Sequence, residues 1–368
     1  MRTFFNVILG ILSVIVGVAL LMTDVISYIQ PISALYILCP LTLFFSTLFI
    51  LTLFLSVYWF CNRFWRMGIV GLLLLAASAP NMMKTYSLVP KYETKNVPDA
   101  ISVMTYNVHL FDWFEGSKGV ANAEKILDYV SSASPDVVCF QEFLYYPTGT
   151  YTLEFIKSKL PDYPYCSVEV LNNSIRVAKC VATFSKYPIV ESEKINFNSS
   201  CHGALKSKIA VGADTLTVVN FYLKSNQLTQ QEKDLVPDAV NPNDSVTDFS
   251  NGVFHKIYNK LVKASLERCM QADTLEYKVK DIDSKLVLCG DMNDIPSSYS
   301  YRTLSEGHND AFLLMTAFSL GSTFHEGIYN FRIDYIFTSK DLVPVEFNLD
   351  NQKMSDHYPL VLNFKTKG

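Results

Sequence analysis

Two short polar segments near the end of the chain contain the side chains best suited to acid–base or phosphate chemistry. Residues 290–294 supply two carboxylates and an amide after a glycine, and residues 355–359 place an aspartate directly before a histidine. Three more segments share this arrangement of a polar group beside an apolar, strand-like run: residues 106–108, 141–142 and 332–335. If the strands end side by side, these groups converge on one site.

Together the five segments resemble the motifs of the endonuclease/exonuclease/phosphatase family. These metal-dependent phosphoesterases include deoxyribonuclease I, AP endonucleases, neutral sphingomyelinases and inositol-polyphosphate 5-phosphatases. The resemblance covers residues 101–364 and implies an α/β fold, in which two packed sheets form a four-layered α/β/β/α sandwich. The alternation of short strand-like and helix-like segments indicates the same class, two sheets covered by helices.

The resemblance implies hydrolysis of a phosphate ester at a metal site. A divalent metal neutralises the phosphoryl charge and stabilises the leaving oxygen. Mg²⁺ prefers oxygen ligands and keeps several waters, so one or two carboxylates suffice, with Mn²⁺ as an alternative ion. By resemblance Glu142 and Asp356 bind the metal, and Asn107 joins them or positions Glu142, a water or a phosphate oxygen. From the residues alone, a surface glutamate and a turn-forming asparagine remain open for Glu142 and Asn107.

The same resemblance assigns the proton transfers. Asp291 accepts a proton from the attacking water, Asn293 orients that water, and Gly290 allows a tight turn out of the preceding strand. His357 donates a hydrogen bond to the scissile phosphate, and Asp334 holds its ring charged and oriented. The alternatives are an Asx turn for Asp291 and Asn293, a turn-capping role for Asp334 and a structural role for His357.

Two positions depart from the motifs of many relatives. Deoxyribonuclease I and sphingomyelinases have a second histidine where this chain has Tyr222. AP endonucleases have a tyrosine there, so a phosphate contact by the Tyr222 phenol is expected. AP endonucleases also have an aspartate where this chain has His109, for which a metal contact and a solvent-facing side chain are both open. The other histidines show no ligand spacing and are expected to be structural or surface residues: His202, His255, His308 and His325.

The composition changes sharply near residue 80. The charged residues before that point are Arg2, Asp24, Arg63 and Arg66. Because the chain has 31 basic and 35 acidic residues, the part after residue 80 has a net charge of −6. An acidic domain is poorly suited to non-specific binding of duplex nucleic acid, which uses a basic surface to displace counterions. A small phosphorylated substrate held by a metal is compatible with this charge.

Three uncharged apolar stretches fill the first part of the chain, at residues 4–22, 34–60 and 67–83. About 20 apolar residues span a bilayer, so each stretch is a candidate membrane helix. A signal peptide is the alternative for the first stretch, but no Ala-x-Ala cleavage site follows it. The expected organisation is a membrane anchor of about three helices at 1–83, a linker at 84–100 and a catalytic domain at 101–366.

The placement of lysine and arginine indicates the orientation in the membrane. Arg2 precedes the first stretch, Arg63 and Arg66 separate the second from the third, and residues 23–33 contain no basic side chain. This pattern favours a cytoplasmic N-terminus and a domain on the extracytoplasmic side of a bacterial inner membrane. The lysines after the third stretch argue for the opposite orientation: Lys84, Lys91 and Lys95.

The eight cysteines have no CxxC spacing, so a zinc site is not expected. Cys139 and Cys289 lie in strand-like runs and are expected in the core. An oxidising compartment would permit a disulfide among Cys166, Cys180 and Cys201, but the sequence does not determine a pairing.

Hydrophobic periodicity predicts the elements that position these residues. Strands are expected at 101–106, 136–140, 215–223 and 285–289, with the last two at 333–338 and 360–364. Helices are expected at 120–132 and 254–280. The polar residues 225–252 are expected to form a surface excursion.

The sequence therefore predicts a membrane-anchored, Mg²⁺-dependent phosphoesterase, with phosphodiester hydrolysis as the expected reaction. Two substrate classes remain open, because fold and motif do not fix the substrate. Nucleic acid is the family's commonest substrate, whereas a phospholipid headgroup is favoured by tethering at the bilayer. A different class of function is a catalytically idle ligand-binding or sensor domain on a membrane stalk. Loss of Asp291, Asn293 or His357 would favour that class, and all three are present.

Overall fold

The computed structural model describes most of the chain, in residues 2–29, 34–92, 97, 99–115, 117–149, 151–173, 177–229, 232, 252–282, 284–327 and 329–367. Two compact units interleave along the chain. The anchor unit contains Met1–Tyr86, Ser225–Met270 and Asp294–Arg302, and the sheet unit contains Ser87–Lys224, Gln271–Asn293 and Thr303–Gly368. Each unit therefore combines segments that are distant in the sequence.

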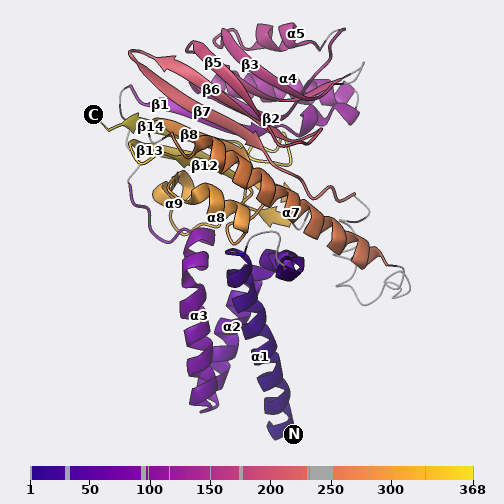
Figure 1. The fold of residues 1–368 in the computed structure, drawn as a ribbon, viewed down its shortest axis with the longest axis vertical. Helices are drawn as coiled ribbons and strands as arrows, with labels where there is room; N and C mark the ends of the chain where they lie inside the picture. The colour runs from indigo at the N-terminus through magenta and orange to yellow at the C-terminus, as the bar shows by residue number, and fades with distance from the viewer. Residues whose placement is uncertain are drawn as a thin grey trace. The chain divides into compact units, whose positions relative to one another are not determined.

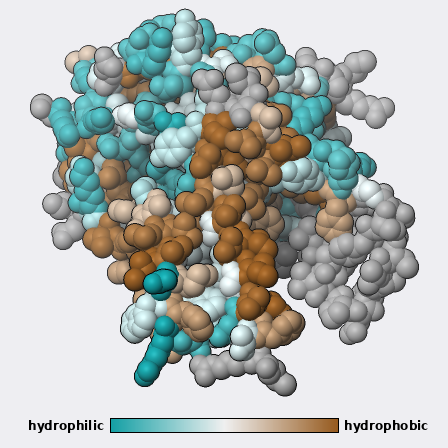
Figure 2. All heavy atoms as spheres, turned by 60° about the horizontal axis from the view of Figure 1, so that its bottom comes forward, coloured by the Kyte–Doolittle hydropathy of each residue, from teal (hydrophilic) through white to brown (hydrophobic). Residues whose placement is uncertain are grey.

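Three helical stretches of the anchor unit are long and apolar enough to cross a membrane, at Thr3–Ile26, Ala34–Cys61 and Trp65–Thr85. The first and third correspond to α1 (Arg2–Ile26) and α3 (Trp65–Thr85). The second is divided into a 3₁₀ helix, η1 (Ala34–Phe44), and α2 (Phe45–Cys61). Pro40 lies inside η1 and lacks the N–H that a continuous α-helix needs. Figure 2 shows hydrophobic residues gathered over a large part of the face that it draws.

Small and polar side chains bring the anchor helices together. A Cβ atom at Gly71 of α3 would lie 1.9 Å from the Oγ of Ser56 on α2, so a larger residue there would force Ser56 to move. Asp24 of α1 accepts hydrogen bonds from Ser78 Oγ at 2.5 Å and Asn81 Nδ2 at 2.6 Å, both on α3. A carboxylate in an apolar helix pair is costly unless it is hydrogen-bonded in this way.

An apolar cluster in the anchor unit includes the middle of α7 (Val253–Val279). Ile26, Tyr36 and Cys39 are buried there together with Cys269 of α7. The partly buried side chains around them include Val262, Leu266 and Tyr299. One side of η1, including Tyr36 and Cys39, therefore packs against protein, although the composition of η1 resembles that of a membrane span.

Among the described residues of the sheet unit, two six-stranded sheets form the inner layers (Figure 1). The first has the order β13-β14-β1-β2-β4-β3 and the second the order β5-β6-β7-β8-β12-β9. The strands of the first sheet are β1 (Ile101–Asn107), β2 (Val137–Tyr145), β3 (Tyr165–Asn173), β4 (Ala178–Ser185), β13 (Leu342–Leu349) and β14 (Leu360–Thr366). Those of the second are β5 (Ile189–Asn196), β6 (Gly203–Val211), β7 (Asp214–Tyr222), β8 (Leu286–Asp291), β9 (Asn309–Asp310) and β12 (Asp334–Thr338).

The remaining described elements are a hairpin and several helices. The hairpin pairs β10 (Phe324–Glu326) with β11 (Tyr329–Phe331). Besides α7, the helices are η2 (His109–Glu115), α4 (Ser117–Ala133), α5 (Leu153–Lys159), α8 (Tyr299–Ser305) and α9 (Ala311–Met315).

Alternating side chains along β1 account for the layers. Val103 packs between the two sheets, in a cluster that includes Val218 of β7. Its neighbour Met104 points to the other face and packs in a cluster that includes Ile126 of α4. Successive residues of a strand face opposite sides, so one strand supplies both interfaces. The four-layered α/β/β/α sandwich expected from the sequence is the observed fold.

Several elements differ in extent from the sequence prediction. β2 was expected to end before Gln141 but continues to Tyr145. β13, at Leu342–Leu349, lies between the two strands that were predicted to be the last two. It is an edge strand containing Pro344, whose missing N–H weakens a strand signal. Most of the expected surface excursion at 225–252 lies outside the described residues.

All eight cysteines are free, so the disulfide considered for Cys166, Cys180 and Cys201 is not formed. Cys139 and Cys289 are fully buried between the two sheets, as the sequence predicted.

Candidate active site

The candidate site lies where β1, β7 and β8 end, beside a bulge in β2. β1 pairs with β2 and β7 pairs with β8, both in parallel, so the strands of each pair run toward the same edge of their sheet. The register places Tyr222 beside Asp291 at the ends of β7 and β8. Asp334, the first residue of antiparallel β12, pairs with Asp291 from the other side. Asn107 ends β1 opposite Gln141.

Asp291 is fully buried and accepts three hydrogen bonds. Its Oδ2 accepts from Nδ2 of Asn107 at 2.8 Å and from Nδ2 of Asn293 at 3.0 Å, and its Oδ1 accepts from the backbone N–H of Asn293 at 2.8 Å. Asn293 has a φ of 54°, a conformation that asparagine tolerates better than most residues. The Asx turn considered from the sequence is thus present, and it fixes the orientation of the Asp291 carboxylate.

Gly290 allows two strands to approach closely just before Asp291. It pairs with Phe221 of β7, and a Cβ atom added to it would lie 1.9 Å from the Phe221 carbonyl oxygen. Its φ of 150° is also unfavourable for other residues. Gly290 lies within β8, so its role is this close approach and not the turn expected from the sequence.

A bulge in β2 directs Glu142 toward the same site. The register between β2 and β4 shifts between Phe140 and Phe143, and Glu142 has a positive φ of 48°. An inserted residue of this kind re-aims side chains and is common next to active sites. Glu142 Oε1 accepts from the Tyr222 hydroxyl at 2.8 Å and from Asn107 Nδ2 at 3.3 Å. One amide nitrogen, that of Asn107, therefore contacts the carboxylates of both Glu142 and Asp291.

The side chain of Asn220 on β7 joins the two sheets at this bulge. Its Nδ2 donates to the carbonyl oxygens of Phe140 at 3.1 Å and Ala182 at 3.0 Å. Its Oδ1 accepts from Gln141 Nε2 at 2.7 Å. Asn220 and Gln141 are fully buried, where unpaired polar groups would be costly. Asn220 thus stabilises the irregular backbone that positions Glu142.

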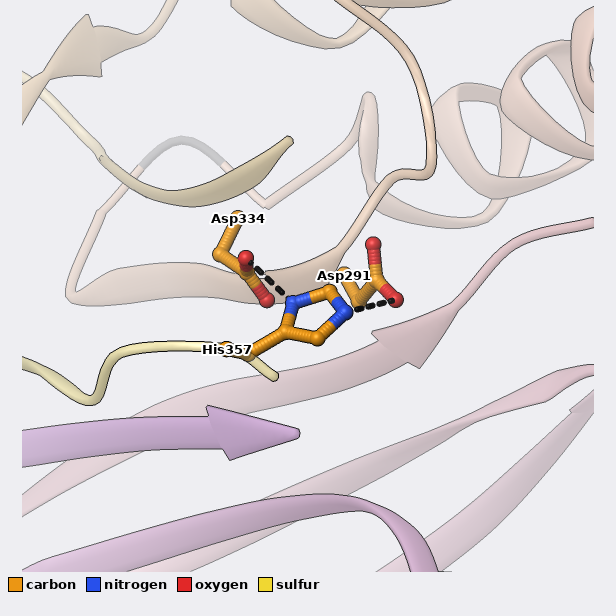
Figure 3. Close-up of side chains that lie close together, drawn as sticks. All are labelled: Asp291, Asp334 and His357. Atoms are coloured by element: carbon orange, nitrogen blue, oxygen red, sulfur yellow. Dashed lines mark hydrogen bonds and ion pairs between the residues drawn. The ribbon is translucent and has the colours of Figure 1, made fainter. Parts of the chain in front are cut away.

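His357 lies between two carboxylates, as Figure 3 shows. Its Nδ1 is 2.8 Å from Oδ2 of Asp334, and its Nε2 is 4.0 Å from Oδ2 of Asp291. Burial disfavours the charged ring, but the negative charges of Asp334 and Asp291 outweigh burial and raise the pKa of His357 well above its usual range. At neutral pH the ring is therefore a cation oriented by Asp334.

The same environment raises the pKa of Asp291. Burial is the largest cause and the negative charge of Asp334 adds to it, so the pKa reaches about 8 despite the opposing charge of His357 and the hydrogen bond from Asn107. A carboxylate with a pKa in this range can accept a proton near neutral pH. The site therefore contains a buried base and a buried cation.

Asp356 and His109 form a partly exposed side of the site. Oδ1 of Asp356 is 3.2 Å from Ser355 Oγ and 3.8 Å from Nδ1 of His109. Ser355 Oγ donates to the carbonyl oxygen of Asn107 at 2.8 Å, which joins this segment to the end of β1. His109 also contacts Asp112 at 3.0 Å and its side chain is 36% exposed. His109 is thus both beside a predicted metal ligand and open to solvent.

The described residues contain one group of three acidic or imidazole side chains with donor atoms within 4.8 Å of one another, formed by Asp291, Asp334 and His357. Within it, His357 and Asp334 already form an ion pair. The carboxylates predicted to bind metal, Glu142 and Asp356, do not belong to that group. Both are partly exposed oxygen donors, which suits Mg²⁺ because this ion keeps several of its waters.

Two histidines lie against residues of the site, although the sequence predicted them to be structural or surface residues. The buried His202 ring lies 4.9 Å from that of Tyr222, centroid to centroid. His325 stacks on Tyr358, directly after His357, with ring centroids 3.8 Å apart. The pairing of β6, which follows His202, with β7 brings His202 there, and a backbone bridge between Phe324 and His357 brings His325. No local spacing in the sequence signals either contact.

Comparison with known proteins gives a consistent picture. The model of a family described as the Endonuclease/Exonuclease/phosphatase family matches residues 104–357. Humanized TDP2 from D. rerio is similar in structure, with a TM-score of 0.50 and 17% identity, over 73% of this chain and 99% of that chain. An endonuclease/exonuclease/phosphatase family protein from Leptotrichia buccalis has a TM-score of 0.51 and 15% identity, over 72% of this chain and 100% of its own.

The catalytic domain of human Nocturnin, solved with a bound sulfate anion, is also similar. Its TM-score is 0.50 and its identity 17%, over 76% of this chain and 100% of that chain. At such identities the likeness shows a shared fold. No curated protein matches the chain.

Proposed function

Because the chain belongs to the endonuclease/exonuclease/phosphatase family, we propose that it is a membrane-anchored phosphodiesterase that depends on Mg²⁺ or Mn²⁺. The proposal assigns residues 1–83 to the anchor, 84–100 to a linker and 101–366 to the catalytic domain. The observation that supports it best is the buried Asp291, which is hydrogen-bonded to Asn107 and Asn293 and lies 4.0 Å from a histidine cation.

In this proposal Asp291 accepts the proton of the attacking water. Its hydrogen bonds to Asn293 fix the carboxylate, so that Asn293 orients both the base and the water. Near neutral pH a fraction of the Asp291 side chains is ionised, because its pKa is about 8. A base of this strength matches the operating pH, which is the favourable case for general base catalysis.

His357 and Asp334 act on the phosphate in this proposal. The His357 cation donates a hydrogen bond to the scissile phosphate, where negative charge develops in the transition state. Asp334 keeps the ring protonated and fixes its orientation through the 2.8 Å contact to Nδ1. Nε2, which lies 4.0 Å from Oδ2 of Asp291, is then the ring nitrogen that donates to the substrate in this proposal.

Glu142 and Asp356 are the proposed metal ligands, with Asn107 beside them. A divalent ion held there would neutralise the phosphoryl charge and stabilise the leaving oxygen. Tyr222 is assigned to orient Glu142 through its 2.8 Å hydrogen bond, and a direct phosphate contact is its alternative role.

Hydrolysis of an aryl phosphodiester tests the reaction. Full-length protein in nanodiscs should hydrolyse bis(p-nitrophenyl) phosphate with Mg²⁺ or Mn²⁺, lose this activity in EDTA and regain it when the ion is restored. Asp291→Asn should lower kcat by about 10²–10⁴-fold, the usual contribution of a general base. Asp350→Asn is the matched control, because Asp350 accepts from Tyr129 outside the site.

Two results would contradict the proposal. One is turnover that EDTA does not affect. The other is an absence of both bound metal and activity on diesters, monoesters, DNA and sphingomyelin, which would instead favour an idle ligand-binding or sensor domain.

Two substrate classes are compared directly in the same assay. D. rerio TDP2 has been solved with a single-strand DNA product, and nucleic acid is therefore one class to test. The net charge of −6 after residue 80 opposes binding of a polyanion, whereas a membrane anchor favours a phospholipid headgroup. Single-stranded DNA and sphingomyelin vesicles, at matched phosphate concentration, separate the two classes by kcat/KM.

We also propose that the domain lies on the extracytoplasmic side of a bacterial inner membrane. Arg63 and Arg66 support this orientation, since Arg63 lies between the second and third spans and Arg66 is the second residue of the third. Alkaline phosphatase fused after residue 368 should then be active, and a fluorescent protein fused there should be dark. The opposite pair of results would place the domain in the cytoplasm.

A further inference from the structure

Four large apolar side chains of the sheet unit are exposed on two short segments that are far apart in the sequence. Leu88 is 49% exposed and Val89 73% on the first, and Phe318 is 75% exposed and Leu320 50% on the second. We call these four residues the docking patch. Single exposed apolar residues are common on protein surfaces, but a group of four on adjoining segments is unusual.

Backbone pairing holds the two segments together. Ser87 and Ser319 exchange hydrogen bonds in an antiparallel bridge, at 2.9 and 3.2 Å. This register sets Leu88 opposite Phe318 on the neighbouring segment. Ser87 Oγ also donates to the Thr316 carbonyl oxygen at 2.6 Å. The patch is thus a defined surface of the fold.

The conformation of Phe318 is costly by itself. Its φ is +50°, which is uncommon for any residue but glycine and an outlier for a bulky one. Strained residues of this kind persist where the surrounding structure fixes them and where function uses them. Here the strain accompanies a phenylalanine residue that is 75% exposed.

Chain length limits how far the patch can lie from a bilayer. The third candidate span, Trp65–Thr85, has 21 residues. At 1.5 Å per residue its length is about 31 Å, close to the roughly 30 Å of a hydrocarbon core. Leu88 follows Thr85 by three residues and so lies within about 10 Å of the end of the span. That distance is comparable with the thickness of the headgroup layer.

The charges of both segments are compatible with a position in the headgroup layer of the bilayer. Residues 87–92 contain one lysine, Lys91, and no acidic residue, and residues 316–321 contain no charged residue. Apolar side chains beside a basic group are typical of surfaces that lie in the membrane interface. We propose that the docking patch inserts into the interfacial layer of the lipid bilayer that holds the anchor.

This proposal is independent of whether the site hydrolyses phosphate esters, so its test uses lipid contact instead of activity. Phe318→p-benzoylphenylalanine is introduced into the full chain, which is reconstituted in nanodiscs of phosphatidylcholine and phosphatidylglycerol and irradiated. Mass spectrometry then measures the share of protein that carries a covalent lipid. Val89→p-benzoylphenylalanine provides a second probe, at a position without the unusual backbone of Phe318.

Val190→p-benzoylphenylalanine is the control, because Val190 is 62% exposed on β5 and is not tied to the end of a span. Lipid adducts at positions 318 and 89 should exceed those at position 190 several-fold. Equal yields at the three positions would overturn the proposal. Crosslinks from positions 318 and 89 to a second copy of the chain, in place of lipid, would also overturn it.

Discussion

Replacing Asp334 by asparagine tests the assignment of a charged His357 most directly. Asp334 touches the imidazole at 2.8 Å, and both side chains are almost completely buried, 2% and 5% exposed. The asparagine has the same shape but no charge. The change therefore removes the main group that keeps His357 protonated, while packing around the ring is preserved.

The magnitude follows from the charge that is removed from the hydrogen bond to His357. A hydrogen bond to a charged group contributes about 1.5–3 kcal/mol, and one pKa unit corresponds to 1.36 kcal/mol. The pKa of His357 should fall by about 1–2 units. The pKa of Asp291, which the charge of Asp334 raises, should also fall. Because activity requires ionised Asp291 and protonated His357, both limbs of the pH profile should move to lower pH.

The assay is the pH dependence of kcat/KM for an aryl phosphodiester, from pH 5 to pH 10 at saturating Mg²⁺. At a pH above the shifted basic limb, activity should be about 10–100-fold below that of the unaltered enzyme, since each 1.36 kcal/mol is tenfold. Asp350→Asn should leave both limbs in place. A basic limb that does not move in the Asp334 variant would show that His357 does not act as the cation.

Three further predictions concern residues around this pair. Glu142→Gln keeps a hydrogen-bond acceptor for Tyr222 but removes a charge expected at the metal. The Mg²⁺ concentration for half-maximal rate should therefore rise about 10–100-fold, and an unchanged concentration would exclude Glu142 as a ligand. His202→Ala should lower kcat/KM about tenfold, whereas His202→Phe should retain most activity because its ring still packs on Tyr222. If His202 acts through the Tyr222 phenol, neither change should lower kcat/KM further in a Tyr222→Phe background. Asn220→Ala removes three buried hydrogen bonds, two to carbonyl oxygens and one from the Gln141 amide, which should cost about 3 kcal/mol and lower the melting temperature by about 6–12 °C. A shift below about 2 °C would contradict its role.

The parts of the site that the sequence located are those with local signals. Asp291 and Asn293 are two residues apart after an apolar run, and Asp356 and His357 are adjacent, so short-range spacing was sufficient to find them. The parallel pairs β1–β2 and β7–β8 then bring the ends of distant strands together. The resemblance to known motifs supplied the topology, which periodicity alone does not give.

The parts that the sequence missed depend on backbone irregularity or distant pairing. Gln141 and Glu142 interrupt an apolar run, and a polar pair of this kind resembles a strand end although it lies at a bulge within β2. Asn220 sits in an apolar strand, where no local feature tells whether it faces the other sheet. His202 reaches Tyr222 because of the pairing of β6 with β7.

The apolar cluster between η1 and α7 has a practical consequence for purification. Ile26, Tyr36 and Cys39 cover one side of α7 around Cys269. A truncated protein that begins after the third helix would expose that side of α7 to water. The exposed apolar surface would then cause aggregation. The protein should therefore be purified in detergent with its apolar helices up to Thr85 retained, and a shortened form that precipitates would say nothing about its chemistry.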